Sequence, residues 1–171
     1  MAANTFKYFG EITLSETTDV SDPCYDRDVW CRITVPTIPG TYKCFGWVAS
    51  DGMIEGIMVV HLDVLNKDRG VEDELGEIGV DSGMAGFFDH KPDLEKDNWK
   101  NLLTVMRRVE DEKRERVYID TLKELNPKYG GSFFTSAGYG DGMYPVFGSH
   151  KDENGRYGRL EIVFIGEEDE E

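Results

Sequence analysis

The stretch YKCFGWVASDGMIEGIMVVHL, residues 42–62, decides the class of fold. It contains two runs rich in aromatic and β-branched residues, 42–49 and 53–62, and each has the length of a β-strand. Asp51-Gly52 lies between them, and this dipeptide between hydrophobic runs is a strong signal for a tight turn that joins antiparallel strands. The stretch therefore predicts a β-hairpin.

Similar β-prone runs lie on both sides of this hairpin. They cover residues 6–9 and 30–35 before it, and 77–80, 85–88, 133–139, 143–149 and 157–165 after it. The sequence Asp152-Glu153-Asn154-Gly155 predicts the turn of a last hairpin. In the last run apolar and charged residues alternate from Leu160, so we expect one face in the core and the other at least partly covered.

Residues 92–126 show a different pattern. Glycine disappears, charged residues become frequent, and Leu94, Leu102 and Met106 recur near helical spacing, a pattern that Tyr118 and Leu122 continue. We therefore predict an α+β fold: a predominantly antiparallel β-sheet sandwich or barrel with a helical insertion at about 92–126. A single domain is expected over 1–166, followed by an acidic disordered tail at 167–171.

The chain is strongly acidic, since 19 Lys and Arg face 34 Asp and Glu and the net charge is −15. Such a surface repels nucleic acids and anionic lipids, so direct binding to either is not expected. The content of hydrophobic residues, 39%, is too high for a disordered acidic chain. The expected partner is a basic protein, and no oligomeric state is predicted.

The compartment is predicted from two features. The N-terminal residues carry no apolar run typical of a signal peptide, and no stretch is long and apolar enough to span a membrane. The three cysteines form an odd set, which is typical of a reducing compartment rather than of a disulfide framework. We expect a cytoplasmic protein, in a bacterial host cell.

No catalytic signature is present in the sequence, and no catalytic residue is predicted. His61, His90 and His150 have no convincing acid–base partner nearby in sequence. Cys24, Cys31 and Cys44 with His61 could supply a Zn²⁺ site, but the spacing is poor, and a cysteine in a β-prone run is commonly a small buried hydrophobe. The expectation is therefore that no metal or cofactor is bound.

Two glycine-rich segments that contain aspartates, 81–89 and 136–145, suggest an alternative function, namely the binding of a small ligand or a metal ion. In one interpretation they share a ligand site, such as that of a hydrolase, that binds Ca²⁺ or a polar molecule. Its residues would be Asp81, Asp89, Ser136, Asp141 and Tyr144. In the other interpretation the aspartates only cap tight turns and the glycines let strands turn, and this interpretation is favoured.

These segments also carry a resemblance. The D-P-C-Y segment at 22–25, the V-D-S-G-x-A-G-x-x-D segment at 80–89 and the G-D-G-x-Y-P segment at 140–145 resemble a family of uncharacterised bacterial and phage proteins. The motifs are in the matching order and span about 21–165. Met84 stands where the pattern commonly has glutamine. The resemblance implies a bacterial or phage source and no mechanism.

The leading hypothesis is a non-enzymatic interaction protein encoded by a phage or mobile element. Spaced carboxylates can stand in for phosphates, so the chain would block the basic, nucleic-acid-binding site of a partner such as a bacterial defence nuclease, as an anti-CRISPR inhibitor that mimics nucleic acid would. Two acidic clusters and the tail from Glu167 are the expected contact sites. The clusters consist of Glu72, Asp73, Glu74 and Glu77, and of Asp93, Glu95 and Asp97.

Overall fold

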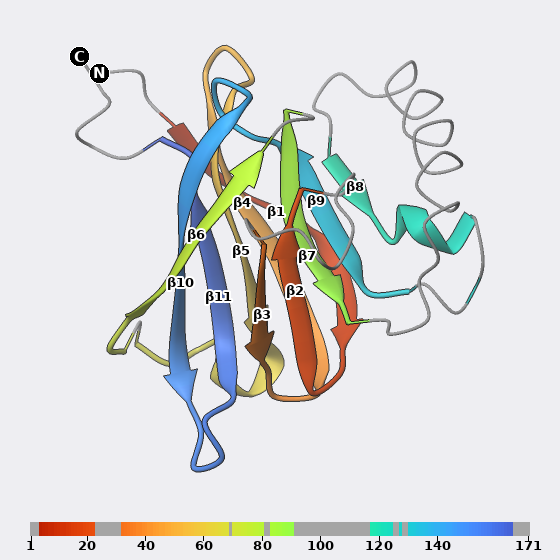
Figure 1. Cartoon of the computed structure of the whole chain (residues 1–171), viewed down its shortest axis with the longest axis vertical. Helices are drawn as coiled ribbons and strands as arrows, with labels where there is room; N and C mark the ends of the chain where they lie inside the picture. Colours follow the sequence, from red (N-terminus) through yellow and green to blue (C-terminus); the bar gives the residue numbers. More distant parts are fainter. Residues whose placement is uncertain are drawn as a thin grey trace.

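Two antiparallel β-sheets face each other in a computed structural model of the chain (Figure 1). The structure describes residues 4–22, 32–68, 70–80, 83–90, 117–124, 127 and 130–165, with only the backbone described at 122 and 124. Every strand pair within the two sheets is antiparallel, which confirms the predicted β-rich fold class.

The larger sheet, sheet A, has six strands in the order β1-β4-β5-β11-β10-β6. These strands are β1 (Asn4–Leu14), β4 (Gly40–Ala49), β5 (Ile54–His61), β11 (Tyr157–Val163), β10 (Gly142–Lys151) and β6 (Asp73–Val80). A short 3₁₀ helix, η1 (Leu62–Val64), follows β5. Strand β6 therefore forms one edge of sheet A and β1 the other.

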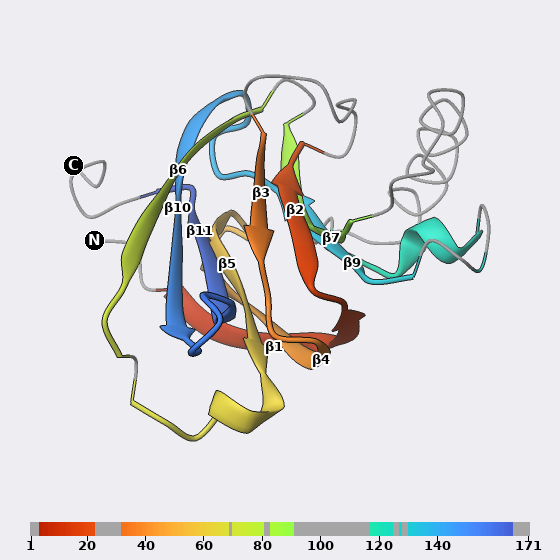
Figure 2. The ribbon, with the colours of Figure 1, turned by 60° about the horizontal axis from the view of Figure 1, so that its bottom comes forward.

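The smaller sheet, sheet B, has five strands in the order β3-β2-β7-β9-β8. These are β3 (Ile33–Pro36), β2 (Thr17–Ser21), β7 (Met84–Asp89), β9 (Ser132–Ser136) and β8 (Val117–Ile119), and a 3₁₀ helix, η2 (Thr121–Glu124), follows β8. Strand β1 approaches β8 and β3 approaches β6, so the edges of the two sheets lie close together, as Figure 2 shows from a second direction.

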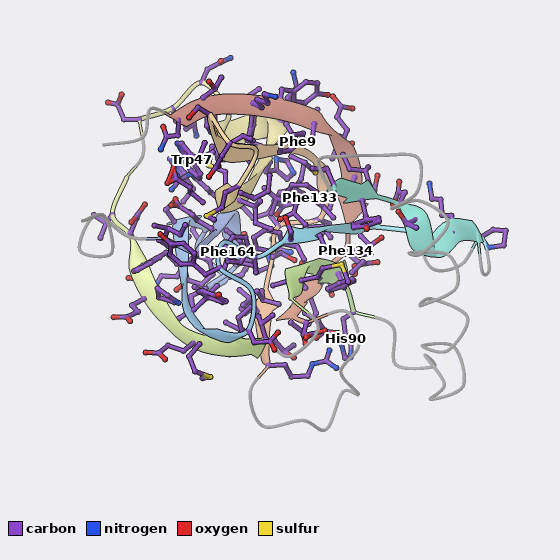
Figure 3. The ribbon with its side chains drawn as sticks, turned by 90° about the horizontal axis from the view of Figure 1, so that it is seen from above. Phe9, Trp47, His90, Phe133, Phe134 and Phe164 are labelled. Carbon is purple, nitrogen blue, oxygen red and sulfur yellow. The ribbon has the colours of Figure 1, made fainter. Side chains whose placement is uncertain are left out.

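The core lies between the two sheets. Sheet A contributes Ile57, Leu160 and Ile162, and sheet B contributes Phe87 and Phe133, all fully buried. Phe133 and Phe134 are successive residues of β9 and point to opposite faces of sheet B (Figure 3). Because one cluster joins both sheets, removal of a large core side chain such as Phe133 would weaken their contact throughout.

Both predicted hairpins are confirmed. Strands β4 and β5 pair as expected, and their turn places Gly52 at a φ of +90°, while Asp51 Oδ1 accepts the backbone N–H of Met53 at 2.9 Å. In the turn between β10 and β11, Asp152 Oδ1 accepts the N–H groups of Asn154 and Arg156. In both turns the aspartate accepts backbone N–H groups and the glycine adopts a positive φ, as is typical of tight turns.

The last strand also has both faces covered, as predicted. Leu160 and Ile162 face the core between the sheets, and Arg159 and Glu161 alternate with them on the opposite face. Both charged residues are buried, and Arg159 Nη2 donates a hydrogen bond to Glu161 Oε1 at 2.8 Å. A charged side chain can lie within a covered face when a partner of opposite charge satisfies it.

Two elements differ from the sequence-based expectation. Strand β2 was not predicted, because Thr17-Thr18-Asp19 carries too few apolar residues, yet it is the second strand of sheet B. The helical pattern expected to continue through Tyr118 is wrong at that point, because β8 is a strand. Its β-branched and aromatic residues pair with β9, where Tyr118 lies opposite Phe134.

Asp120 ends β8 with a φ of +54°, and its Oδ1 accepts the N–H of Gly131 at 2.7 Å. The chain then forms only the 3₁₀ helix η2 where a helix was expected. The remainder of the predicted helical insertion, residues 92–116 and 125–126, lies outside the described residues, as do the D-P-C-Y segment after Asp22 and the tail at 167–171.

Candidate functional site

The first predicted acidic cluster lies on the edge strand β6 and the residue before it. Two of its four members are held by neighbouring strands. Glu72 Oε1 accepts from Arg159 Nη1 at 3.0 Å, and Asp73 Oδ2 accepts from the hydroxyl of Tyr157 at 2.7 Å. The hydrogen bond from Tyr157 lowers the pKa of Asp73. These two carboxylates therefore join β6 to β11 as well as adding charge.

The other two members, Glu74 and Glu77, are exposed. Glu74 pairs with Phe147 of β10 and Glu77 with Pro145, so both lie on the face of sheet A that points away from sheet B. Neither forms an ion pair with another described residue. Glu74 and Glu77 are called the acidic end below. The second predicted cluster, Asp93, Glu95 and Asp97, lies outside the described residues.

A row of cross-strand neighbours crosses all six strands on this outer face of sheet A. It begins at Tyr8 on β1 and ends at Glu74 on β6, and each member lies opposite the next in the strand register. The members, in order, are Tyr8, Phe45, Met58, Glu161, Phe147 and Glu74. Side chains opposite one another on adjacent strands touch, so this outer row is continuous across the sheet, although Glu161 at its centre is buried.

The row is aromatic at the end formed by β1 and β4. Phe6 and Tyr8 are 47% and 54% exposed, although large apolar side chains are usually covered. The Phe6 ring stacks on Phe45 at 5.0 Å between centroids and lies 5.1 Å from Trp47. Tyr8 lies 5.6 Å from Phe45. These four residues form one aromatic cluster, called the aromatic end below.

Local features of the strands build the aromatic end. The register of β1 shifts between Tyr8 and Gly10, which turns Phe9 toward the core and leaves Tyr8 outside. Gly56 lies opposite Trp47, and a Cβ there would lie 3.3 Å from the indole ring. The missing side chain at Gly56 lets Trp47 lie close to the sheet.

The centre of the outer row places one guanidinium between two carboxylates. Arg159 donates to both Glu161 and Glu72, at 2.8 and 3.0 Å, and all three groups are at least half-buried. The exposed carboxylates of the described outer face therefore lie toward its edges: Glu74 and Glu77 on β6, and Glu11, which lies opposite Lys43, on β1. The β1 end differs from the β6 end in its exposed aromatic side chains.

The structure separates Asp89 from the other described members of the alternative ligand site, and it places Tyr144 beside Asp141. Asp89 ends β7 and accepts from the N–H and hydroxyl of Ser15, whereas Ser136 lies opposite Met84 at the beginning of β7. Five residues of extended chain place these two about 17 Å apart. Asp141 is exposed in the turn before β10, and Asp81 lies outside the described residues.

Tyr144 has a structural role in that turn. Its buried hydroxyl donates toward the carbonyl oxygens of Gly140 at 2.5 Å and Ala137 at 3.3 Å. Burial, and then the Asp141 carboxylate, raises the pKa of Tyr144. The hydroxyl therefore secures the glycine-rich turn.

The possible zinc ligands are only partly described, since Cys24 and Cys31 lie outside the described residues. Cys44 is fully buried in the core, and burial raises the pKa of its thiol. His61 has both ring nitrogens engaged, with the Pro39 carbonyl at 2.9 Å and the Asp63 N–H at 3.0 Å. Among the described residues, no group of three or more His, Cys, Asp or Glu is placed to hold a metal ion.

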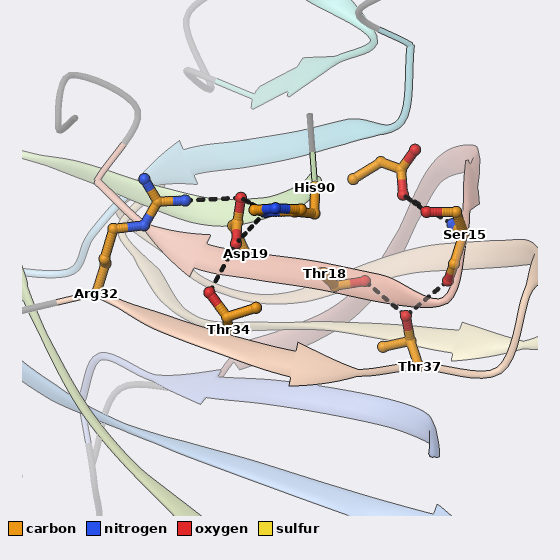
Figure 4. A network of polar contacts seen from close by, with 8 residues as sticks. Ser15, Thr18, Asp19, Arg32, Thr34, Thr37 and His90 are labelled. Atoms are coloured by element: carbon orange, nitrogen blue, oxygen red, sulfur yellow. Dashed lines mark hydrogen bonds and ion pairs between the residues drawn. The ribbon is translucent and has the colours of Figure 1, made fainter. Parts of the chain in front are cut away.

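A buried polar network that the sequence analysis missed lies on the outer face of sheet B (Figure 4). Asp19 of β2 is 4% exposed, and its carboxylate contacts Arg32 Nη2 at 2.7 Å and His90 Nδ1 at 2.9 Å. Thr34 donates to the same carboxylate at 2.9 Å. The network joins three strands, because Arg32 precedes β3 and His90 follows β7. No motif marks it, since its members are up to 71 residues apart.

Aromatic rings pack beside this network on the same face. Phe88 stacks on Phe134 at 5.5 Å, and Phe134 stacks on Tyr118 at 4.8 Å. Figure 3 shows Phe134 and His90 on the side of sheet B that points away from Phe133. Phe134 and Tyr118 are fully buried, so this face of sheet B is covered, in contrast to the aromatic end of sheet A.

The fold and its surfaces define the chain as an antiparallel β-sandwich protein with an exposed aromatic surface and an acidic edge strand. No protein-family model matches the chain, and no match was found among curated proteins or solved structures. Among the described residues, no helix is long and apolar enough to cross a membrane.

Proposed function

We propose that this chain is a non-enzymatic acidic interaction protein that occupies the basic, nucleic-acid-binding site of another protein. A bacterial defence nuclease is the expected kind of partner, in which case the chain acts as an anti-CRISPR-like inhibitor in the bacterial cytoplasm. The phage or mobile-element origin rests on the resemblance of the three short motifs. The observation that carries the proposal is the pair of exposed carboxylates, Glu74 and Glu77, on the edge strand β6.

The spacing of these carboxylates suits phosphate mimicry. Glu74 and Glu77 lie on one face of a paired strand, so their backbone positions are fixed before a partner binds. Three residues of strand with a register shift span about 7 to 10 Å, which is the axial length occupied by two or three phosphates of one DNA strand. A lysine- and arginine-lined groove would therefore meet charges at comparable intervals.

The distribution of ion pairs supports the same proposal. Arg159 neutralises Glu72 and Glu161 within sheet A, and Lys151 lies 3.5 Å from Asp73. The structural carboxylates thus have cations from this chain, whereas no described residue forms an ion pair with the acidic end, which a cation of the partner would meet. The net charge of −15 would further speed the encounter with a basic partner through long-range attraction.

The experiment is a competition between this chain and duplex DNA. The tagged protein is incubated with bacterial lysate at low salt, and retained proteins are identified and then challenged with DNA or with rising salt. The proposal expects a nucleic-acid-binding protein that both DNA and salt displace. The variant carrying Glu74→Lys and Glu77→Lys should lose it, and Glu153→Lys, an exposed charge reversal in the β10–β11 turn, should retain it. Retention that is indifferent to salt, or to both β6 substitutions, would contradict the proposal.

A further inference from the structure

The outer row is longer than the proposed acidic contact and also includes the aromatic end. Strands in a sheet lie about 4.8 Å apart, so the five steps from Tyr8 to Glu74 cover about 24 Å, which is the length of about seven residues of extended chain. The two exposed ends of the row are therefore separated by a distance that one extended segment crossing the strands can span.

The two ends of the row require different chemistry from that segment. At the aromatic end, Phe6 and Tyr8 are exposed and stacked against Phe45, so they offer a contact for leucine-like or aromatic side chains. At the acidic end, Glu74 and Glu77 offer two carboxylates to lysine or arginine. A second copy of this chain would bring a like net charge of −15 to this face, so charge complementarity favours a basic partner.

We infer that the outer face of sheet A docks an extended segment of the partner protein, with apolar side chains on Phe6, Tyr8 and Phe45 and basic side chains on Glu74 and Glu77. The inference rests on the proposed function for the charge of the partner, and it adds where the partner binds and which side chains it presents. Because Arg159 and Glu161 pair with each other at the centre of the row, the segment needs only small or polar residues between its two ends.

The test uses three synthetic peptides as probes and measures their affinity for the full chain by fluorescence anisotropy. The first peptide has two leucines at one end, two arginines at the other and four glycine and serine residues between them, which span the distance from Phe45 to Glu74. The second replaces the leucines with serine. The third places the leucines directly beside the arginines, so that it cannot reach both ends of the row.

We expect the first peptide to bind at least about fivefold more tightly than either of the others, because only it engages both ends. Tyr8→Ser and Phe6→Ser should remove this advantage, whereas Tyr139→Ser, which changes a 72% exposed aromatic residue outside the row, should preserve it. Glu74→Gln with Glu77→Gln should weaken the binding of the first and second peptides alike and reduce its salt dependence, and Glu153→Gln should do neither. All substituted side chains are exposed, so circular dichroism is expected to show unchanged folding.

The outcomes separate this inference from the proposed function. If the three peptides bind equally and only the acidic substitutions weaken them, the carboxylates contact a basic partner but the docking surface is wrong. If none of the peptides responds to Glu74→Gln with Glu77→Gln, the proposed function fails as well. If sedimentation shows a dimer of the free chain that Tyr8→Ser dissociates, a second copy occupies the face, and the inference is overturned.

Discussion

Replacing Asp19 with asparagine should destabilise the fold more than any other isosteric change on sheet B. The carboxylate is 4% exposed and contacts Arg32 at 2.7 Å, His90 at 2.9 Å and Thr34 at 2.9 Å. Asparagine keeps one oxygen and loses the charge. The guanidinium of Arg32, whose side chain is 9% exposed, then lies buried without its anion.

The magnitude follows from the cost of leaving a buried charge without its partner. Removing one member of such a pair costs about 3 to 5 kcal/mol, and the retained oxygen places Asp19→Asn near the lower value. Thr34→Val removes a single hydrogen bond to the same carboxylate and should cost about 1 kcal/mol. With a urea dependence of about 2 kcal/mol per molar, Asp19→Asn should lower the unfolding midpoint by about 1.5 M.

Urea unfolding followed by circular dichroism measures these differences. A double-mutant cycle with Arg32→Met tests the cause, because Arg32→Met should cost at least about 1 kcal/mol less in the Asp19→Asn background than in the wild-type chain. If Asp19→Asn costs no more than Thr34→Val, or if the Asp19 and Arg32 substitutions are additive, the ion pair does not hold β2 and β3 together.

Three further substitutions test other parts of the fold. Gly86→Ala should destabilise the chain by several kcal/mol in urea unfolding, since the added Cβ would lie 2.1 Å from a backbone oxygen of β9, and an unchanged midpoint would contradict the close approach of β7 and β9. Tyr144→Phe should cost about 1 kcal/mol and speed amide hydrogen exchange in the turn at Gly140, whose carbonyl loses its donor; unchanged exchange would show that the hydroxyl does not secure the turn. Burial, and then the contact with Asp73, raises the pKa of Tyr157 to about 12 from 10.0, so its contribution to stability is complete below pH 10 and is lost as the pH rises toward 12. In the Asp73→Asn variant the pKa of Tyr157 should fall but stay above 10, because the burial remains. The pKa is measured from the absorbance of the phenolate, with Tyr157→Phe as reference. An unchanged pKa would show that Asp73 does not contact Tyr157.

The part of the fold that depends on local signals could be predicted from the sequence. Asp51-Gly52 and the segment from Asp152 to Gly155 specify their hairpins through residues adjacent in the chain. Strand β2 could not be predicted in this way, since Asp19 is compatible with a buried strand only once Arg32 and His90 neutralise and bond its carboxylate. The partners of Asp19 are therefore brought together only in the folded sheet and cannot be identified from neighbouring residues in the sequence.

Only part of the candidate surface could be predicted from the sequence, for a similar reason. Four acids around β6 were identified, but only the pairing of β6 with β10 and the contact of Glu72 with Arg159 of β11 distinguish exposed Glu74 from Glu72. The outer row draws one residue from each of six strands, so no motif could reveal it. The alternation of Phe45 and Trp47 with Cys44 and Gly46 was an available signal, because it indicated a strand apolar on both faces.

A nuclear magnetic resonance titration of the intact, unmodified chain tests the central claim most directly. The leucine–arginine peptide is added in steps while the amide and side-chain resonances are followed, so the site is located without any substitution. The account predicts that the largest shifts lie along the outer row of sheet A, at Tyr8 and Phe45 at one end and at Glu74 at the other. Shifts confined to the neighbourhood of Asp19 and His90 on sheet B, or shifts absent from either end of the row, would contradict it.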